Sequence, residues 1–339
     1  FVAMGLVAPI VGRGFRRFGA RRVMALGAVV MGGGLCLTAS APIAALFLVG
    51  WALTGMGGAM FLTTAAYAYL AAYADDQARG FIGTLMLVTG LSGSVFWPVT
   101  AFLDATFGWR GAVLVYAAIM VIMVAPLVLF GLPETGGPEV DGAPRRRACP
   151  GRSRAFLLLV LVIALNSFVT FGIEAIGIEL FRSMGADMAR AVAIASLRGV
   201  FKVGGRVVDV AGGKRWDGLS TGIVSGAAIP LGLLALAAWG SGWWPVACYL
   251  GLFGIGSGAF AVARATMPLV FYQKADYAMA MSTVALPMNL INALAPPVLA
   301  GLLVAAGPRP VLLVLSAVSS IAFLAILQLR RLRPLPTLS

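Results

Sequence analysis

Long apolar runs set the strongest limit on how this chain can fold. Many of them reach about 20 residues, the length that a helix needs to cross a hydrocarbon core of about 30 Å. Hydrophobic residues make up 60% of the sequence and charged residues only 11%, far from the composition of a soluble globular domain. We therefore predict a polytopic, all-α membrane protein with a partial span at 1–11 and further spans at 23–41, 43–72, 81–103, 111–132, 155–178, 189–208, 219–239, 243–272, 278–305 and 309–329.

A short motif of glycine and basic residues occurs twice and indicates an internal repeat. The segment Gly12–Arg22 recurs at Gly205–Arg215, an offset of 193 residues (205 − 12). In each copy, a glycine among basic residues separates two apolar runs, as in a short loop between membrane helices. A second set of matches relates residues 98–110 to residues 297–309 at an offset of 199 (297 − 98). The chain is thus predicted to contain two similar halves in parallel order.

Domain boundaries follow from this repeat. We assign residues 1–132 to an N-terminal transmembrane half, residues 133–154 to a polar, Pro/Gly-rich linker, and residues 155–339 to a C-terminal transmembrane half. Two spans lead up to the second copy of the motif, whereas only part of one precedes the first copy. We therefore expect about eleven helices here and a complete bundle of six plus six, with the first helix and part of the second upstream of Phe1.

The basic residues indicate a membrane topology. The formal net charge is +13, but the charges form short clusters between apolar runs, which fits the positive-inside rule and argues against nucleic-acid binding. Clusters at 13–22, 145–154 and 330–333 fall on one side of the predicted topology, and the opposite loops hold only Arg110, Arg182, Arg190 and Arg309. We expect a multi-pass protein of the cell membrane, namely a bacterial cytoplasmic (inner) membrane, with the linker and both termini in the cytoplasm.

Several kinds of chemistry are excluded by the residues present. The sequence contains no His, so His-dependent triads, His proton relays and imidazole metal sites cannot form. The segment Gly90–Gly93 matches the G-x-S-G pattern of intramembrane serine proteases, but without a His base close helix packing explains it better, as it explains Gly254 and Gly258. The three cysteines lack paired spacing, and the phosphate-binding loop of ATPases is absent. We predict no enzyme activity, no metal and no cofactor.

The repeated motif resembles the G-x-x-x-D-R-x-G-R-R loop between helices 2 and 3 of the major facilitator superfamily, and the resemblance covers the whole chain. Segments Gly55–Gly58, Gly108–Arg110 and Arg264–Pro268 resemble bacterial members, particularly those similar to monocarboxylate porters. In one departure, Arg16 occupies the acidic position of the first loop, although its counterpart Asp209 is retained. The proline-glycine motif of drug:proton antiporters is also missing. The resemblance implies a monomeric secondary transporter with two six-helix halves that works by alternating access.

Polar groups inside the spans are the candidates for a site, because a charge there costs about 2.5–3.5 kcal/mol or more. Four-residue spacing places Arg198 and Lys202 on one helix face and gives another helix a polar stripe that ends at Glu174. In the family that the chain resembles, these helices and the tenth line the central cavity. We predict proton coupling at Glu174 and substrate binding by Arg198, Lys202, Arg264, Asn166, Thr170, Asn289, Asn292 and Trp97.

The sign of the charges favours an anionic substrate. Three cations in the spans, Arg198, Lys202 and Arg264, face one acid, Glu174. Because Arg can bind a carboxylate through two hydrogen bonds, we predict transport of a small organic anion, with a monocarboxylate first. An anion arriving at Arg198 would release Glu174 to take up a proton, which gives proton symport a physical basis.

Other functions stay open from the sequence alone. The charged groups could only hold the bundle together, for example through an ion pair between Glu174 and Arg198. An aromatic pocket of Trp51, Trp97 and Tyr67 would suit an efflux transporter for lipophilic drugs. From another class, the chain could be a non-transporting membrane sensor or an inactive fragment. The prolines at 296–297 are expected to break the helix beside the two asparagines.

Charges exchanged between the halves predict a cytoplasmic gate. Arg16 occupies the position of Asp209, and Asp75 occupies that of Lys274. We predict two ion pairs of opposite polarity, Arg16 with Asp75 (or its neighbour at 76) and Asp209 with Lys274, each contributing about 0–1 kcal/mol. The glycines of the repeated motif are assigned to the same gate as hinge positions, namely Gly12, Gly19 and Gly205.

Overall fold

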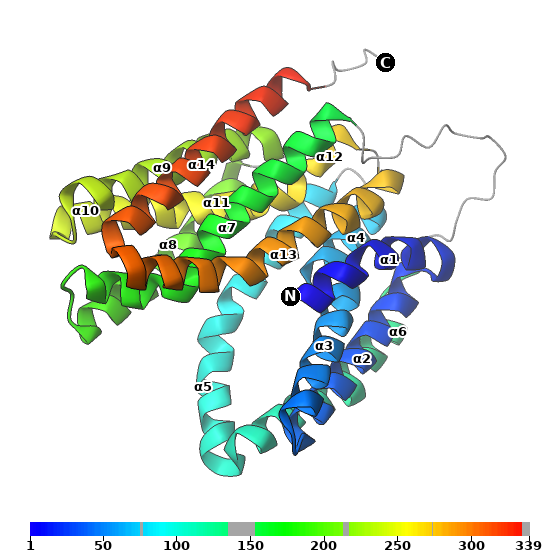
Figure 1. The fold of residues 1–339 in the computed structure, drawn as a ribbon. Coiled ribbons are helices and arrows are strands. Elements are labelled where there is room, and N and C mark those ends of the chain that lie inside the picture. Colours follow the sequence, from blue (N-terminus) through cyan, green and yellow to red (C-terminus); the bar gives the residue numbers. More distant parts are fainter. Residues whose placement is uncertain (75–76, 135–152, 213–216, 273, 334–339) are drawn as a thin grey trace. The chain divides into compact units, whose positions relative to one another are not determined.

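The computed structural model describes residues 1–74, 77–134, 153–212, 217–272 and 274–333, and all regular secondary structure in these ranges is helical (Figure 1). Labels α and η denote α-helices and π-helices. In chain order they are α1 (Val2–Phe18), α2 (Ala20–Ser40), α3 (Ala44–Phe61), α4 (Thr63–Tyr73), α5 (Ala78–Ala118), η2 (Ile119–Val124), α6 (Ala125–Gly131), α7 (Arg154–Ser183), α8 (Met188–Gly212), α9 (Gly218–Trp239), α10 (Trp243–Cys248), η5 (Tyr249–Gly254), α11 (Ile255–Thr266), α12 (Pro268–Phe271), α13 (Lys274–Ala306) and α14 (Pro308–Arg331).

Membrane-length helices make up most of the described chain. Eight helical segments are long and apolar enough to cross a membrane, and two shorter apolar helices, Val2–Phe15 and Ala78–Gly90, accompany them. Helix α8 has 25 residues and carries several charges, so length rather than apolarity identifies it as a span. Within the described residues these segments give eleven (8 + 2 + 1), and the predicted all-helical membrane fold is confirmed.

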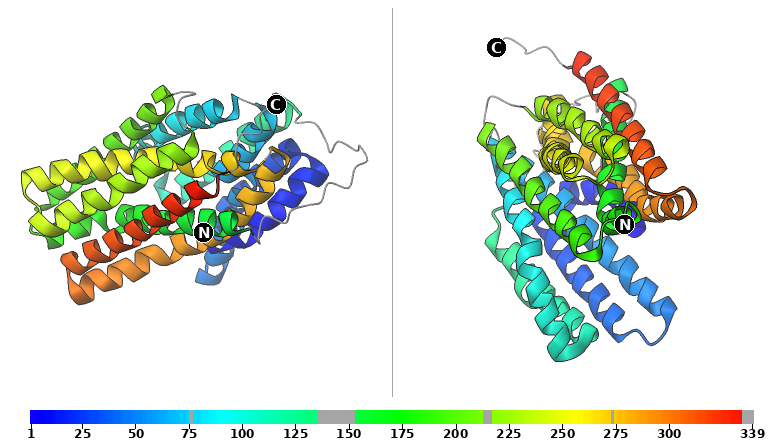
Figure 2. Two further views of the ribbon diagram at one scale, coloured as in Figure 1. Left: turned by 90° about the horizontal axis from the view of Figure 1, so that it is seen from above. Right: turned by 90° about the vertical axis from the view of Figure 1, so that its left-hand side faces the viewer.

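The chain divides into two compact units, and each is described by itself. Unit 1 comprises Phe1–Ala78, Val88–Pro150 and Gln273–Leu290, and unit 2 comprises Arg79–Leu87, Gly151–Tyr272 and Ile291–Ser339. The two longest helices, α5 and α13, supply residues to both units. Within unit 2, α14 packs along α9 and α7, and the views of Figures 1 and 2 agree on this arrangement.

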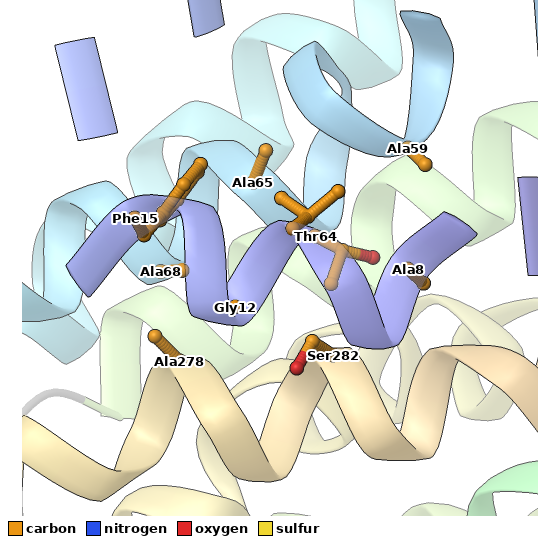
Figure 3. Close-up of a pocket in the computed structure, with 10 residues that line it drawn as sticks. Ala8, Gly12, Phe15, Ala59, Thr64, Ala65, Ala68, Ala278 and Ser282 are labelled. Atoms are coloured by element: carbon orange, nitrogen blue, oxygen red, sulfur yellow. The ribbon is translucent and has the colours of Figure 1, made fainter. Parts of the chain in front are cut away.

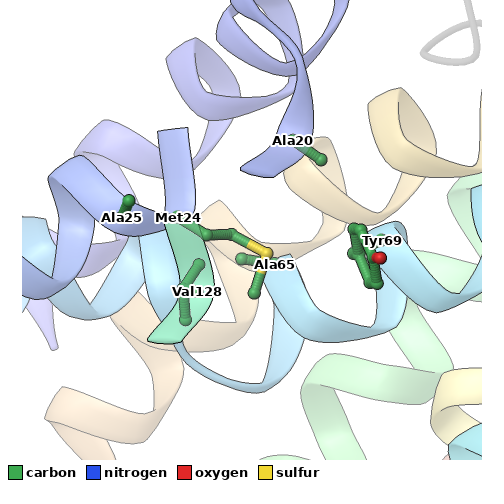
Figure 4. Close-up of a cluster of buried hydrophobic side chains, with 6 residues drawn as sticks. All are labelled: Ala20, Met24, Ala25, Ala65, Tyr69 and Val128. Carbon is green, nitrogen blue, oxygen red and sulfur yellow. The ribbon is translucent and has the colours of Figure 1, made fainter. Parts of the chain in front are cut away.

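Unit 1 is held together by close backbone contact and by an apolar cluster. A Cβ atom on Gly57 of α3 would lie 2.5 Å from the backbone nitrogen of Met31 in α2, closer than real Cβ contacts come. Small residues therefore let α2 and α3 touch backbone to backbone, as is common between membrane helices. The neighbouring cluster draws buried side chains from α2, α4 and α6, namely Ala20, Met24, Ala25, Ala65, Tyr69 and Val128 (Figure 4).

Helix α8 packs against η5 and α11 in unit 2 by the same means. A Cβ atom on Gly258 would collide with the backbone carbonyl of Lys202, and one on Gly254 would lie 2.7 Å from Cβ of Phe201. A Cβ atom on Gly205 would collide with the carbonyl oxygen of Ile255, the first residue of α11. The packing interpretation of Gly254 and Gly258 is therefore confirmed.

Single glycines separate several consecutive helices. Helix α1 continues to Phe18, so the predicted loop after Gly12 is wrong, and the chain turns at Gly19 with φ 82°. Long basic side chains can extend from a helix end to the membrane surface, so they do not require a loop. Gly108 (φ 69°, ψ 169°) and Gly307 (φ 80°, ψ −176°), which the repeat relates at an offset of 199 (307 − 108), adopt nearly the same conformation. Residues other than glycine rarely adopt it.

Three predicted spans differ in detail from the structure. The span at 43–72 consists of two helices that meet at Leu62, whose ψ is −163°. The span at 243–272 contains the π-helix η5. The predicted break at the prolines of 296–297 is wrong, because α13 is helical throughout Lys274–Ala306. Packed neighbours and local adjustments satisfy the freed carbonyls of proline-containing helices in membranes.

Candidate functional site

An ion pair between α7 and α8 forms the centre of the candidate site. Lys202 Nζ donates a hydrogen bond to Glu174 Oε1. The two side chains are 26% and 39% exposed, so protein atoms cover them only in part. Because charged groups facing lipid are costly, an exposed pair on two membrane-length helices indicates contact with water. The predicted pairing of Glu174 with Arg198 is wrong, because Lys202, one turn further along α8, reaches the carboxylate instead.

Arg198 lies against the backbone of α7. Its Nη1 donates a hydrogen bond to the carbonyl oxygen of Ile173 at 2.9 Å. Gly177 of α7 lies beside this contact, since a Cβ atom there would be 3.5 Å from the same nitrogen, an ordinary contact distance. Tyr249 of η5, which is 1% exposed, also interacts electrostatically with Arg198. Neither the carbonyl nor the phenol carries a negative charge, so they orient the guanidinium without neutralising it.

Arg264 of α11 contacts α7 nearer to the start of that helix than Arg198 does. Its Nη1 donates to Ser167 Oγ at 3.4 Å, and Ser167 is 2% exposed. Beside it, Asn166 is also buried, and Thr170 Oγ1 donates to the carbonyl of Asn166 at 2.9 Å. The sequence prediction omitted Ser167, although a hydroxyl next to Asn166 in an apolar span was a usable signal.

The four charged groups form one electrostatic cluster with excess positive charge. Glu174 interacts with Lys202 and also with Arg198 and Arg264. Three cations and one carboxylate sum to +2 (3 − 1). Within the described part of the chain, neither Arg198 nor Arg264 has a carboxylate oxygen within 4.0 Å. The cluster therefore offers two guanidinium groups that no carboxylate of the described residues pairs with.

The other predicted binding residues fall into both units. In unit 2, Asn292 is 4% exposed, and its Oδ1 has no hydrogen-bond partner among the described residues. In unit 1, Asn289 donates from Nδ2 to the carbonyl of Ala285 at 2.8 Å, and a Cβ on Gly5 would lie 3.2 Å from the Cβ of Asn289. Asn289 thus lies in a contact between α1 and α13. The side chain of Trp97 lies outside the described residues.

The acid of the second motif copy, Asp209, has a partner that the sequence prediction missed. Asp209 is 3% exposed, and its Oδ1 accepts hydrogen bonds from Arg79 Nη2 at 3.1 Å and Thr221 Oγ1 at 2.5 Å. The predicted partner of Asp209 was Lys274. No repeat or spacing relates Arg79 to Asp209, so the positive charge of Arg79 was the sole signal in the sequence for this pair. The side chain of Lys274 lies outside the described residues, as do the side chain of Arg16 and residue Asp75.

A second carboxylate of unit 2, Asp217, caps α9. Its Oδ1 accepts the backbone N–H of Ser220 at 2.7 Å, and its Oδ2 lies 3.0 Å from Arg333 Nη2. Burial raises the pKa of Asp217, but the hydrogen bonds from Ser220 and the charges of Arg333 and Arg79 outweigh burial, and the pKa is lowered from its ordinary value. The charged form of this carboxyl therefore stabilises the start of α9.

A narrow pocket in unit 1 lies beside Gly12 of the first motif copy. A Cβ atom on Gly12 would lie 2.5 Å from Ser282 Oγ and 3.4 Å from the carbonyl of Ala278, so α1 and α13 are in close contact here. Gly19, in contrast, has no atom within 4 Å of a Cβ position and serves the turn. The pocket is lined mainly by small apolar side chains, namely Ala8, Val11, Gly12, Phe15, Ala59, Thr64, Ala65, Ala68, Ala278 and Ser282 (Figure 3). It lacks charged groups that could select a solute.

Two of the aromatic residues predicted for a drug pocket have different surroundings. Trp51 is 53% exposed and packs edge-on against Phe47, with ring centroids 6.3 Å apart. Tyr67 is only 3% exposed. Trp51 is therefore open to its surroundings, whereas Tyr67 belongs to the core of unit 1.

Comparisons with known proteins agree with this helical architecture. A family model described as Major Facilitator Superfamily matches residues 1–216. Curated protein sequences give no significant match.

Solved structures give close fold matches at low sequence identity. The human organic anion transporter MFSD10 (TETRAN) matches with a TM-score of 0.71 and 17% identity, over 96% of this chain and 81% of that one. The E. coli fucose:proton symporter FucP matches with a TM-score of 0.71 and 14% identity, over 98% of this chain and 89% of that one. The proton:xylose symporter XylE, bound to 6-bromo-6-deoxy-D-glucose, matches with a TM-score of 0.77 and 13% identity, over 98% and 87%. At these identities the matches speak for the fold alone.

Proposed function

The chain belongs to the major facilitator superfamily of secondary transporters, and from that premise we propose that it carries a small organic anion across the membrane. The observation that supports this proposal is the unpaired positive charge of Arg198 and Arg264 beside the exposed Glu174–Lys202 pair. Excess positive charge in a water-filled site within a bilayer is relieved when an anion binds. A monocarboxylate is the simplest solute of this class.

Arg198 is the residue that this proposal depends on most. Its guanidinium is oriented by the carbonyl of Ile173, which leaves other N–H donors for a carboxylate. In protein reconstituted into liposomes, Arg198→Gln should weaken binding of an organic anion by about tenfold or more. Arg182→Gln is the matched control, because Arg182 is 46% exposed and pairs with Glu179 at the end of α7. Unchanged anion binding in Arg198→Gln, or a preference of the wild type for cations, would contradict the proposal.

We further propose that a proton is the coupling ion and that Glu174 binds it. An anion bound at Arg198, one helical turn from Lys202, competes with Glu174 for the ammonium group, and a carboxylate that loses its cation binds a proton more readily. This revises the partner expected from the sequence from Arg198 to Lys202 and keeps the same coupling. The site would then alternate between a paired Glu174 without substrate and a protonated Glu174 with substrate.

A substitution at Glu174 separates coupling from binding. Glu174→Gln should still exchange substrate across the membrane but lose its acceleration by an inward pH gradient. Glu179→Gln is the control on the same helix, since Glu179 is 62% exposed and pairs only with Arg182 among the described residues. If Glu174→Gln keeps the full response to the pH gradient, Glu174 does not carry the proton.

The gate and the topology complete the proposal. We place the ends of α1 and α8 that carry the repeated motif in the cytoplasm of a bacterial cell, on the grounds of the charge distribution. Asp209 with Arg79 would close this side, and Gly12, Gly19 and Gly205 would allow the neighbouring helices to move. A cysteine-accessibility experiment at Arg330, which lies near the end of α14, would test the topology, since labelling from outside intact cells would contradict it.

A further inference from the structure

The two unpaired guanidinium groups contact α7 at separate points. Arg198 donates to the carbonyl of Ile173, and Arg264 donates to the hydroxyl of Ser167. Ser167 and Ile173 are six residues apart (173 − 167), which corresponds to an offset of about 9 Å along the helix axis and about 120° around it. Two separated cationic groups are therefore available, rather than one cluster of donors at a single point.

Glu174 interacts electrostatically with both guanidinium groups. Its carboxylate interacts with both Arg198 and Arg264 but pairs directly with Lys202. Lys202 is therefore the cation that Glu174 compensates, and the remaining charge of +2 (3 − 1) belongs to the two arginines. A solute with a single negative charge would leave one of these charges without a counter-ion.

We propose that the substrate carries two carboxylates at the ends of a short carbon chain, one bound by Arg198 and the other by Arg264. Each guanidinium–carboxylate contact takes up about 3 Å, so an axial offset of about 9 Å leaves at least a few ångströms for the chain between the carboxylates. This inference rests on the proposed function, because it requires the same anion site. It adds a specific task for Arg264, which is to distinguish a dicarboxylate from a monocarboxylate.

Succinate and butyrate make a matched pair of probes, because both have four carbons and only succinate has a second carboxylate. Binding to the purified protein in detergent is measured for both compounds by calorimetry near pH 7. In the wild type, succinate should bind about tenfold or more tightly than butyrate. Equal affinities would overturn the inference. Inorganic sulfate serves as a compact dianion, and sulfate binding as tight as that of succinate would overturn it as well.

Substitutions then test which arginine binds each carboxylate of succinate. Arg264→Gln should lower the ratio of succinate to butyrate affinity about tenfold or more, whereas Arg198→Gln should weaken both compounds. Arg264→Lys keeps the charge without the two-pronged geometry and should give an intermediate ratio, which tests the assignment even if the Gln variant folds poorly. If Arg198→Gln weakens both compounds but neither Arg264 variant changes the ratio, only the two-carboxylate inference fails. If Arg198→Gln weakens neither, the proposed anion site itself fails.

Discussion

Gly205→Ala should push α8 away from α11, and Gly204→Ala is the control for the change of glycine to alanine. A methyl group at Gly205 would collide with the carbonyl oxygen of Ile255 and would lie 2.9 Å from the backbone nitrogen of Ala259. All of these obstacles are backbone atoms, which cannot rotate away as a side chain can. The helices would have to move apart by on the order of 1 Å to reach ordinary contact distances. Overpacking of this kind costs about 1–3 kcal/mol.

Gly204→Ala isolates that cost. Gly204 is in the same helix, and a Cβ atom there would meet no atom within 4 Å. Both substitutions gain the same helix propensity, about 0.5–1 kcal/mol, so the difference between the variants reports the contact alone. Thermal unfolding of the purified proteins, followed by tryptophan fluorescence, should place Gly205→Ala roughly 2–8 °C below Gly204→Ala. Equal midpoints, or a more stable Gly205→Ala, would refute the close packing of α8 on α11.

Three other substitutions test separate parts of the structure. Thr221→Val keeps the side-chain shape but removes a hydrogen bond to buried Asp209, so it should lower the free energy of unfolding by about 1.5–3 kcal/mol in denaturant titrations. Asp217→Asn keeps the helix cap but not the charge. Because the folded pKa of Asp217 is lowered, the wild type should lose stability as the pH falls below about 4 and through that folded pKa, and the variant should lose less. Gly307→Ala, at φ 80°, should cost about 1–3 kcal/mol in the same titrations. Its control, Gly301→Ala on α13, meets no atom within 4 Å and should stabilise the fold by up to about 1 kcal/mol.

The helices could be predicted because apolar length and glycine positions are local properties of the sequence. Gly108 and Gly307 end their helices at the predicted places, since a positive φ is required there and glycine supplies it. The repeat also predicts equivalent positions for these two glycines, at an offset of 199 (307 − 108). The end of α1 was harder to predict, because basic side chains at positions 13–17 are compatible with a helix as well as with a loop.

Partner choice in the site could not be predicted, because it depends on distances between helices. Arg198 and Lys202 occupy the same face of α8 one turn apart, so their spacing does not tell which of them pairs with Glu174. The close contact of Gly258 with the Lys202 backbone fixes how α8 lies beside its neighbours. Asp209 and Arg79 are separated by 130 residues, and no periodicity relates them. A pairing of this kind emerges only from the folded chain.

The π-helix η5 changes the phase of the helix that carries Arg264. In a π-helical turn the hydrogen bonds join residues five apart, so the segment Tyr249–Gly254 accommodates about one residue more than an α-helix would. Side chains beyond Gly254 are therefore rotated by about 100° from the direction that a regular helix starting at Trp243 would give them. A helical wheel drawn over the whole span would assign Arg264 to the wrong face. Deleting one residue within η5 would thus act on the site as a rotation of Arg264, with little change in the length of the span.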